Sequence, residues 1–196
     1  MKQRIFSLIL ISGVALSSLS AQIFLDNASL EGQPQDATVP VGWHACDELT
    51  TPDILPGAWG VLTRPANGGT YMGLITRADG TFEQVGQRLN TPLIANECFN
   101  FSVKLAHSST YAGYNLPIKL RIWGGKSRCS KDQLLVETGP IKNEDWEKHT
   151  FNFYTKGVYH YIIFEAQIMD GIYFSYNGNI LIDEISPIMI CHRASL

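Results

Sequence analysis

The stretch FNFSVKL at residues 99–105 alternates apolar and polar side chains over its whole length. That period of two is typical of a β-strand with one face buried and the other toward solvent. Residues 116–123 repeat the pattern, with apolar side chains at positions 116, 118, 120 and 122 on one face. The opposite face carries Lys119, Arg121 and Trp123. Both stretches therefore predict strands that contribute one face to a core.

In the rest of the chain, the residue pattern is more typical of short β-strands than of helices. Further strands are expected, from alternation or from dense apolar runs, at residues 23–25, 70–76, 84–89, 150–154, 159–166 and 180–185. Turn signals such as Asp79-Gly80 and Asn177-Gly178 separate them. Residues 131–138 are the best candidate for a short helix. Recurrent short strands with such turns predict an all-β sandwich.

Residues 1–21 have the order of a secretory signal peptide. A basic start with Lys2 and Arg4 leads into an apolar run, which ends in the small-residue patch 17–21. The apolar run is shorter than the roughly 20 residues that a spanning helix needs, so we do not expect a membrane anchor here. We expect export, and a single domain over residues 22–196 with no stable membrane span. Its destination is the periplasm, the cell surface or the medium.

The charge balance excludes one class of partner. Without Lys2 and Arg4, 13 basic residues stand against 18 acidic ones, a net charge of about −5. Nucleic-acid binders concentrate positive charge, so no nucleic acid is expected as a partner.

Four cysteines follow the leader, and an even number in an oxidising compartment predicts two disulfides. Three pairings are open to a chain with four cysteines. We expect Cys98–Cys191, because Cys98 begins one strand, Cys191 follows the last, and antiparallel neighbours bring such ends together. Cys46–Cys129 would then tie the long irregular segment 33–69 to the body of the domain.

Several motifs, in this order, resemble the galactose-binding-like jelly-roll domains, which include many carbohydrate-binding modules. They are the opening strand FLDNASLE at 24–31, PVGW at 40–43, QRL at 87–89 with CFNFS at 98–102, and the closing strand ILIDEI at 180–185. The resemblance implies a two-sheet antiparallel jelly-roll β-sandwich that binds carbohydrate or cell-envelope glycan.

The chain is also similar to the jelly-roll domain that precedes OmpA-like domains in some secreted bacterial proteins. The matching segments are YMGL at 71–74, LRIWGG at 120–125 with Cys129, and YNGNILID at 176–183. No OmpA-like domain follows within the 196 residues, so peptidoglycan tethering is not carried over.

The same resemblance implies a metal site. Galactose-binding-like domains often hold a structural calcium where the first and last strands meet, and Glu31 and Asp183 match the acidic positions of those motifs. Calcium takes six to eight oxygens, so backbone carbonyls would supply most of the shell. The alternative is that Glu31 ends a strand and Asp183 accepts a bond from a loop amide. No other cofactor is expected.

Aromatic side chains are the candidates for ligand binding, because sugar rings present apolar C–H faces on which flat rings stack. Trp123 shares a strand face with Arg121 and Lys119, which predicts a stacking platform with hydrogen-bonding neighbours; the alternative is a Trp that caps the sandwich edge. Trp59, in a Pro/Gly-rich loop, is the second candidate. Three tyrosines complete the set: Tyr71, Tyr111 and Tyr114.

Catalytic motifs are missing from the sequence, which contains neither G-x-S-x-G nor H-E-x-x-H. The carboxylate pairs Asp53/Glu83 and Glu165/Asp183 could in principle flank a glycosidic bond, but such pairs need a defined separation that sequence does not show. We therefore expect a non-catalytic binding domain. A structural or adhesive envelope protein that contacts other proteins is the alternative, and a glycan hydrolase is a distant one.

Overall fold

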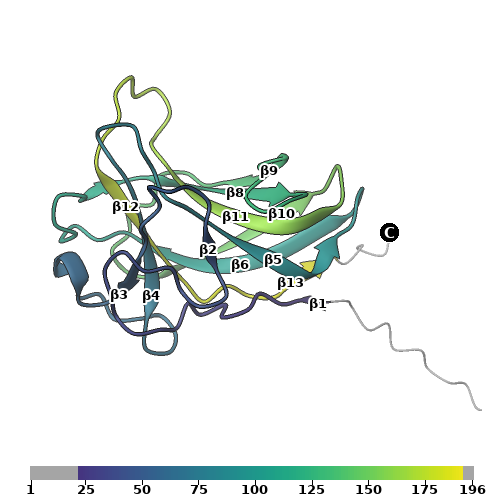
Figure 1. Ribbon diagram of the computed structural model, residues 1–196, viewed down its shortest axis with the longest axis horizontal. Coiled ribbons are helices and arrows are strands. Elements are labelled where there is room, and N and C mark those ends of the chain that lie inside the picture. The colour runs from purple at the N-terminus through teal and green to yellow at the C-terminus, as the bar shows by residue number, and fades with distance from the viewer. Residues whose placement is uncertain (1–21, 192–196) are drawn as a thin grey trace, which may run out of the picture.

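The computed structural model describes residues 22–191, so the signal peptide expected at residues 1–21 lies outside the described part (Figure 1). The domain is a two-sheet, predominantly antiparallel jelly-roll β-sandwich, as the sequence motifs implied. Its only helical segment within residues 22–191 is the short 3-10 turn η1 (Ala58–Gly60). No helix in this range is long and apolar enough to cross a membrane.

The larger sheet has the strand order β1-β13-β6-β12-β4-β3, with β10 added along β6 and the short β7 paired in parallel with β12. Its strands are β1 (Gln22–Ile23), β3 (Asp53–Leu55), β4 (Tyr71–Thr76), β6 (Cys98–Ala106), β7 (Leu116–Pro117), β10 (Glu147–Tyr154), β12 (Gly178–Asp183) and β13 (Ile188–Ile190). The smaller sheet has the order β2-β5-β11-β8-β9. Its strands are β2 (His44–Ala45), β5 (Gln84–Leu93), β8 (Lys119–Gly125), β9 (Gln133–Glu137) and β11 (Tyr159–Gln167).

The main core lies between the two sheets and is built from alternate residues, as the period of two requires. Phe101, Val103 and Leu105 of β6 face Leu120 and Ile122 of β8 within one buried cluster. The alternating stretches that predicted strands thus supply the two inner faces of the sandwich.

A second, smaller cluster covers the outer face of the larger sheet. Tyr71 and Ile75 of β4 pack with Leu181 of β12 beneath residues of the neighbouring loops, such as Val61 and Tyr111. The end of the sandwich that carries η1 lies opposite the end at which β1 and β13 meet (Figure 1).

Three details of the predicted secondary structure were wrong. The opening motif at 24–31 is not a strand, because the chain turns soon after β1, where the Leu30 N–H donates to the Asn27 carbonyl. Residues 116–123 are not one strand, because the chain leaves β7 in the larger sheet and enters β8 in the smaller one, so that Leu116 is exposed while Ile118 is buried. The expected helix at 131–138 is instead strand β9, whose pairing with the edge of β8 satisfies its backbone groups.

Both predicted disulfides are confirmed. Cys98–Cys191 joins the start of β6 to the residue that follows β13, where the Cys191 N–H also donates to the Cys98 carbonyl at 2.9 Å. Cys46–Cys129 joins the segment after β2 to the loop 126–132 between β8 and β9. Each bond closes a long loop, since the paired cysteines are 93 and 83 positions apart along the chain.

Candidate functional site

Lys119 and Arg121 point away from the core on β8, as predicted, but ion pairs engage both side chains. The Lys119 ammonium lies 3.1 Å from Glu137 and 2.8 Å from Asp170, and only 3% of this residue is exposed. The Arg121 guanidinium pairs with the same Glu137. These cations balance neighbouring carboxylates, so the predicted hydrogen-bonding role toward a ligand is not supported by their positions.

Trp123 is not the open stacking platform that the sequence predicted. The indole ring is half-buried, its N–H is buried without a partner, and the Lys131 ammonium lies 5.8 Å from the ring centroid. Lys131 also pairs at 2.6 Å with the buried Glu165 on the neighbouring strand β11. The loop 126–132, held by the Cys46–Cys129 disulfide, therefore covers this face of the smaller sheet.

Replacing Trp123 by alanine should lower stability without affecting ligand binding. The lost packing under Lys131 should cost about 1–3 kcal/mol, which thermal melting would measure. Retention on any polysaccharide that the wild-type protein binds should stay the same. Loss of retention with an unchanged melting temperature would instead restore Trp123 as a binding residue.

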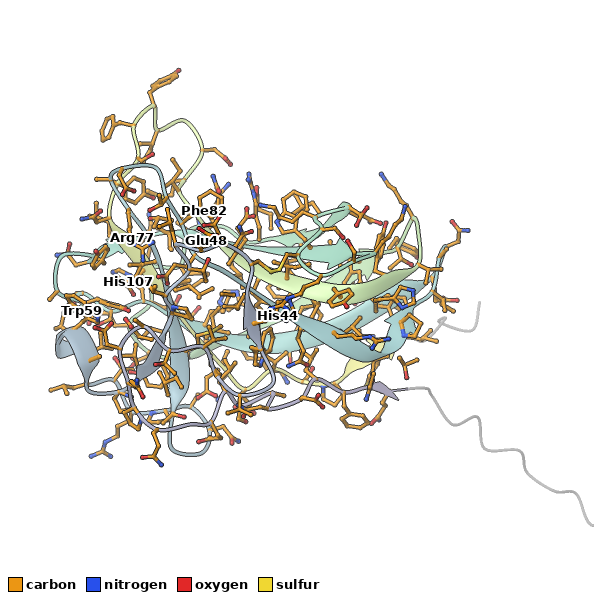
Figure 2. The ribbon with its side chains drawn as sticks, viewed as in Figure 1. His44, Glu48, Trp59, Arg77, Phe82 and His107 are labelled. Atoms are coloured by element: carbon orange, nitrogen blue, oxygen red, sulfur yellow. A yellow bond between two sulfur atoms is a disulfide. The ribbon has the colours of Figure 1, made fainter. Side chains whose placement is uncertain are left out.

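A different group of predicted residues does come together. Trp59, Tyr111 and Tyr114 line a cavity of about 250 Å³ at the η1 end of the sandwich. Figure 2 shows Trp59 on η1 at the edge of the domain, with the Arg77 label further into the molecule. The remaining lining residues come from several segments of the chain: Asp36, Ala37, Thr51, Asp53, Ile75 and Arg77. We call this space the Trp59 cavity.

The backbone around Trp59 holds an otherwise unfavourable conformation. Trp59 has φ of 53°, and it stands between Gly57 at 120° and Gly60 at 77°. A bulky residue in the left-handed region is strained, and such strain persists only where surrounding contacts impose it. Here the Ala112 N–H donates to the Trp59 carbonyl at 2.9 Å, which ties η1 to the loop after β6. The ring remains 44% exposed and packs edge-to-face on Tyr114, with centroids 6.2 Å apart.

Two carboxyl groups lie on the inner side of the Trp59 cavity. The Trp59 indole N–H donates to Asp36 at 2.9 Å, and Asp53 accepts from the Ala37 N–H at 2.8 Å and from the Tyr111 hydroxyl. Burial raises the pKa of Asp53 to about 7, against the lowering effect of the Tyr111 hydrogen bond. The Trp59 hydrogen bond, followed by the interaction with Asp53, lowers the pKa of the exposed Asp36. Near neutral pH the pair therefore comprises one carboxylate and one partly protonated acid.

The raised pKa of Asp53 makes stability depend on pH. The folded protein retains a proton on Asp53 up to about pH 7, whereas the unfolded chain loses it near 3.8, so the free energy of unfolding falls as pH rises through this window. Asp183, whose pKa burial raises to about 6, acts in the same direction.

We expect Asp53→Asn to reduce that dependence. From pH 5 to pH 8 the wild type should lose up to roughly 2–3 kcal/mol of stability that the variant keeps. Urea unfolding at the two pH values measures the difference, with Asp145→Asn, at an exposed carboxylate, as control. A variant that keeps the full wild-type pH slope would contradict the assignment to Asp53.

Arg77, directly after β4, forms a fixed wall of the Trp59 cavity. Its guanidinium donates to Glu83 at 2.7 Å, to the Thr51 hydroxyl at 2.9 Å and to the Leu49 carbonyl at 3.3 Å. Glu83 is almost fully buried, and burial raises its pKa while Arg77 lowers it. The ion pair therefore holds the segment 49–51 against the end of β4, and the arginine charge is already balanced.

The loop 107–115, which carries Tyr111 and Tyr114, is anchored by a buried asparagine. The Asn179 side chain donates to the carbonyls of Ser108 and Tyr114 at 2.8 and 2.7 Å and accepts from the Ser108 N–H at 3.0 Å. Tyr111 is only 1% exposed, and its hydroxyl donates a hydrogen bond to Asp53. Tyr114, by contrast, is partly exposed.

The prediction that Tyr71 contacts ligand was wrong. Tyr71 is fully buried in the second cluster, packs edge-to-face on Trp146, and donates to the Thr63 carbonyl at 2.8 Å. Alternation along β4 places it on the outer face, but the loops cover that face.

Glu31 and Asp183 meet at one loop and bind its amides. Asp183 accepts from the N–H groups of Ala66 and Asn67 at 2.8 and 3.0 Å, and Glu31 accepts from Gly69 at 3.1 and 3.0 Å. For Asp183 these are the contacts of the alternative role, a bond from a loop amide; Glu31 does not end a strand but binds an amide of the same loop. Between residues 22 and 191 no third acidic, His or Cys ligand gathers with them, and oxygens directed at N–H donors fit a calcium shell poorly.

We accordingly expect calcium to have no effect on stability. The melting temperature of the mature protein should be the same in EDTA and in millimolar calcium, as measured by differential scanning fluorimetry. An upward shift with calcium that chelation reverses would establish the metal site at Glu31 and Asp183.

The arrangement of the carboxylates gives no support to a hydrolytic pair among the described residues. Glycosidases place two carboxyls roughly 5–9.5 Å apart on either side of the scissile bond, whereas Asp36 and Asp53 interact directly. Glu83 is held by Arg77 behind the cavity wall, and Glu165 and Asp183 lie in different sheets. One His/Cys group, His44 with Cys46 and Cys129, is close enough to bind a metal, but its two cysteines form a disulfide.

Sequence reasoning missed Asp36, Thr51 and Arg77 as cavity residues. Arg77 had a weak signal, since it stands between an expected strand and the Asp79-Gly80 turn. Asp36 and Thr51 lie in the irregular segment 33–69 and carry no motif.

The fold defines the class of protein as a jelly-roll domain like those of carbohydrate-binding modules and adhesins. No family model matches the sequence, and no curated protein matches it significantly. Among solved structures, the chain is similar to the CBM22-1 xylan-binding domain of Paenibacillus barcinonensis Xyn10C, with a TM-score of 0.55, 12% identity, and coverage of 91% of this chain and 99% of that one.

Two other structures show the same fold. The K2 cleaved adhesin domain of Lys-gingipain has a TM-score of 0.55 at 9% identity, covering 90% of this chain and 100% of that domain. Arabinose-bound MgGH51 α-L-arabinofuranosidase has a TM-score of 0.56 at 8% identity; the match covers 87% of this chain but only 27% of the enzyme. At these identities the likeness is one of fold.

Proposed function

We propose that this protein is a secreted, non-catalytic domain that binds carbohydrate in the Trp59 cavity. One observation carries the proposal: an exposed tryptophan and a partly exposed tyrosine border a cavity whose inner side is lined by carboxyl groups and an arginine. A sugar ring can pack its apolar face on Trp59 while its hydroxyls donate to Asp36 and accept from Arg77.

Three further features support this proposal. The two disulfides suit a protein that matures in an oxidising compartment, in agreement with the signal peptide expected at residues 1–21. The interaction between the Asp36 and Asp53 carboxyl groups does not suit the separated pair that a glycosidase uses. A xylan-binding domain shares the fold.

A binding screen on the oxidised mature protein tests the proposal. Soluble and insoluble polysaccharides, including xylan and peptidoglycan, would be assayed by affinity electrophoresis and pull-down. We expect retention by at least one glycan. Blank results with every glycan would reject carbohydrate binding.

Adhesion to another protein is the second candidate, and the loop between β11 and β12 favours it. This loop projects from the sandwich (Figure 1), and within it Tyr173 is fully exposed and Phe174 is 74% exposed. Exposed neighbouring aromatics are common in protein interfaces. A Tyr173→Ser/Phe174→Ser variant that loses binding to bacterial or host cell surfaces, with glycan retention blank for the wild type, would favour this function.

A further inference from the structure

The electrostatics of the Trp59 cavity carry an inference about which sugars it accepts. The groups that face it come from four elements: Asp36 from the segment before β2, Asp53 from β3, Arg77 from the end of β4, and the tyrosines from the loop after β6. Arg77 is the only cation among the lining residues, and Glu83 already balances it at 2.7 Å.

The remaining charge in the Trp59 cavity is negative. Asp36 is exposed toward solvent, and its bond from the Trp59 indole N–H favours the ionised form. Asp53 lies beside it, almost fully buried. The carboxylate of an acidic sugar stacked on Trp59 would thus lie next to one or two carboxyl groups of the protein. The lining residues include no cation that is free to balance its charge, because Arg77 is paired with Glu83. Like charges in a partly desolvated site repel strongly.

The polar groups suit a neutral sugar. A carboxylate such as Asp36 accepts hydrogen bonds from hydroxyl pairs, and the guanidinium N–H groups of Arg77 that are not used by Glu83, Thr51 and Leu49 can donate to hydroxyl oxygens. The volume of about 250 Å³ lies just below the 300–1,000 Å³ range of drug-sized pockets, which suits a single sugar unit.

We infer that the Trp59 cavity selects an uncharged sugar unit and rejects sugars that carry a carboxylate, such as uronic acids. This inference rests on the proposed function, since it concerns the same cavity. It makes the acidic pair Asp36/Asp53 a selectivity filter as well as a hydrogen-bonding group.

Matched sugar pairs test the inference directly. The methyl glycosides of glucose, galactose and mannose would compete with the retained polysaccharide at pH 7.5, each beside the corresponding uronic acid and the methyl ester of that acid. We expect the uronate to compete at least about tenfold less well than its neutral partner, and the ester, similar in size but uncharged, to recover most of the difference. Uronates that compete as well as the neutral sugars would overturn the inference.

Two further measurements separate charge from shape. Asp36→Asn should reduce the difference between uronate and neutral sugar in competition strength. Asp145→Asn, at another exposed carboxylate, is the matched control. Raising ionic strength on the wild-type protein should reduce that difference too, because salt screens charge repulsion; this arm remains valid if the Asp36 variant fails to fold. A difference that neither change reduces would reject the electrostatic cause.

The outcomes also distinguish this inference from the proposed function. If no sugar or polysaccharide binds at all, carbohydrate binding itself fails and the inference falls with it. If glycans bind but Trp59→Ala leaves retention intact, the site lies elsewhere. If retention needs Trp59 but uronates bind equally well, only the selection against charge is wrong.

Discussion

Trp59→Ala is expected to reduce glycan affinity by about 30-fold or more, which corresponds to the 2 kcal/mol or more that a central aromatic contributes at a binding site. The physical reason is that Trp59 is the most exposed aromatic of the cavity and offers the face on which a sugar ring would pack. Affinity electrophoresis in the retained polysaccharide measures the loss.

The same substitution should barely affect stability, because the indole is 44% exposed and its main partners are Tyr114 and Asp36. Leu62→Ala is the control, since Leu62 is an apolar residue just after the η1 turn that is even more exposed, at 76%, and does not line the cavity. Trp59→Phe separates the two roles of the side chain, since it keeps an aromatic face but removes the hydrogen bond to Asp36. Unchanged retention in Trp59→Ala would place the binding site elsewhere.

Removing either disulfide should produce the largest loss of stability. The Cys98→Ala/Cys191→Ala and Cys46→Ala/Cys129→Ala variants should each lose about 2–5 kcal/mol, because each bond closes a loop of more than 80 residues in the unfolded chain. For a domain of this size the melting temperature should fall by roughly 10 °C. Scanning calorimetry on the purified variants measures both effects.

The two variants should differ in one respect. Without Cys46–Cys129, the loop 126–132 loses its covalent attachment above Trp123, so tryptophan fluorescence of the native state should shift toward the red. Without Cys98–Cys191, the shift should be absent, because that bond lies at the β1–β13 end. Stabilities within error of the wild type would show that noncovalent contacts alone hold these segments.

The alternating stretches predicted the sandwich well because burial acts on individual strands. In residues 99–105 every second side chain faces the core, and the same holds from Ile118 to Ile122. The disulfide pairs were also predictable, since strand order in an antiparallel sheet brings Cys98 and Cys191 together. The exchange of sheets between β7 and β8 was not, because both halves of the stretch keep the same alternation.

The candidate site was predicted only in part. Trp59, Tyr111 and Tyr114 were named from residue type and loop context, and they do line one cavity. Trp123 and Tyr71 were also expected at the ligand, but loops cover both. A strand pattern shows which face a side chain occupies and says nothing about what another segment places over that face.

The sequence by itself predicted most of the β-strands, the two-sheet class and, among three possible pairings, the two disulfides; the export signal at the N-terminus stays an expectation. These follow from local periodicity, from residue counts and from the order of motifs. Only the tertiary structure decided where a ligand can bind. The Trp59 cavity joins Asp36, Asp53, Arg77 and Tyr111, which meet through the β3–β4 pairing, the Arg77–Glu83 ion pair and the Asn179 anchor. Such contacts join residues far apart in the chain, so no local pattern encodes them.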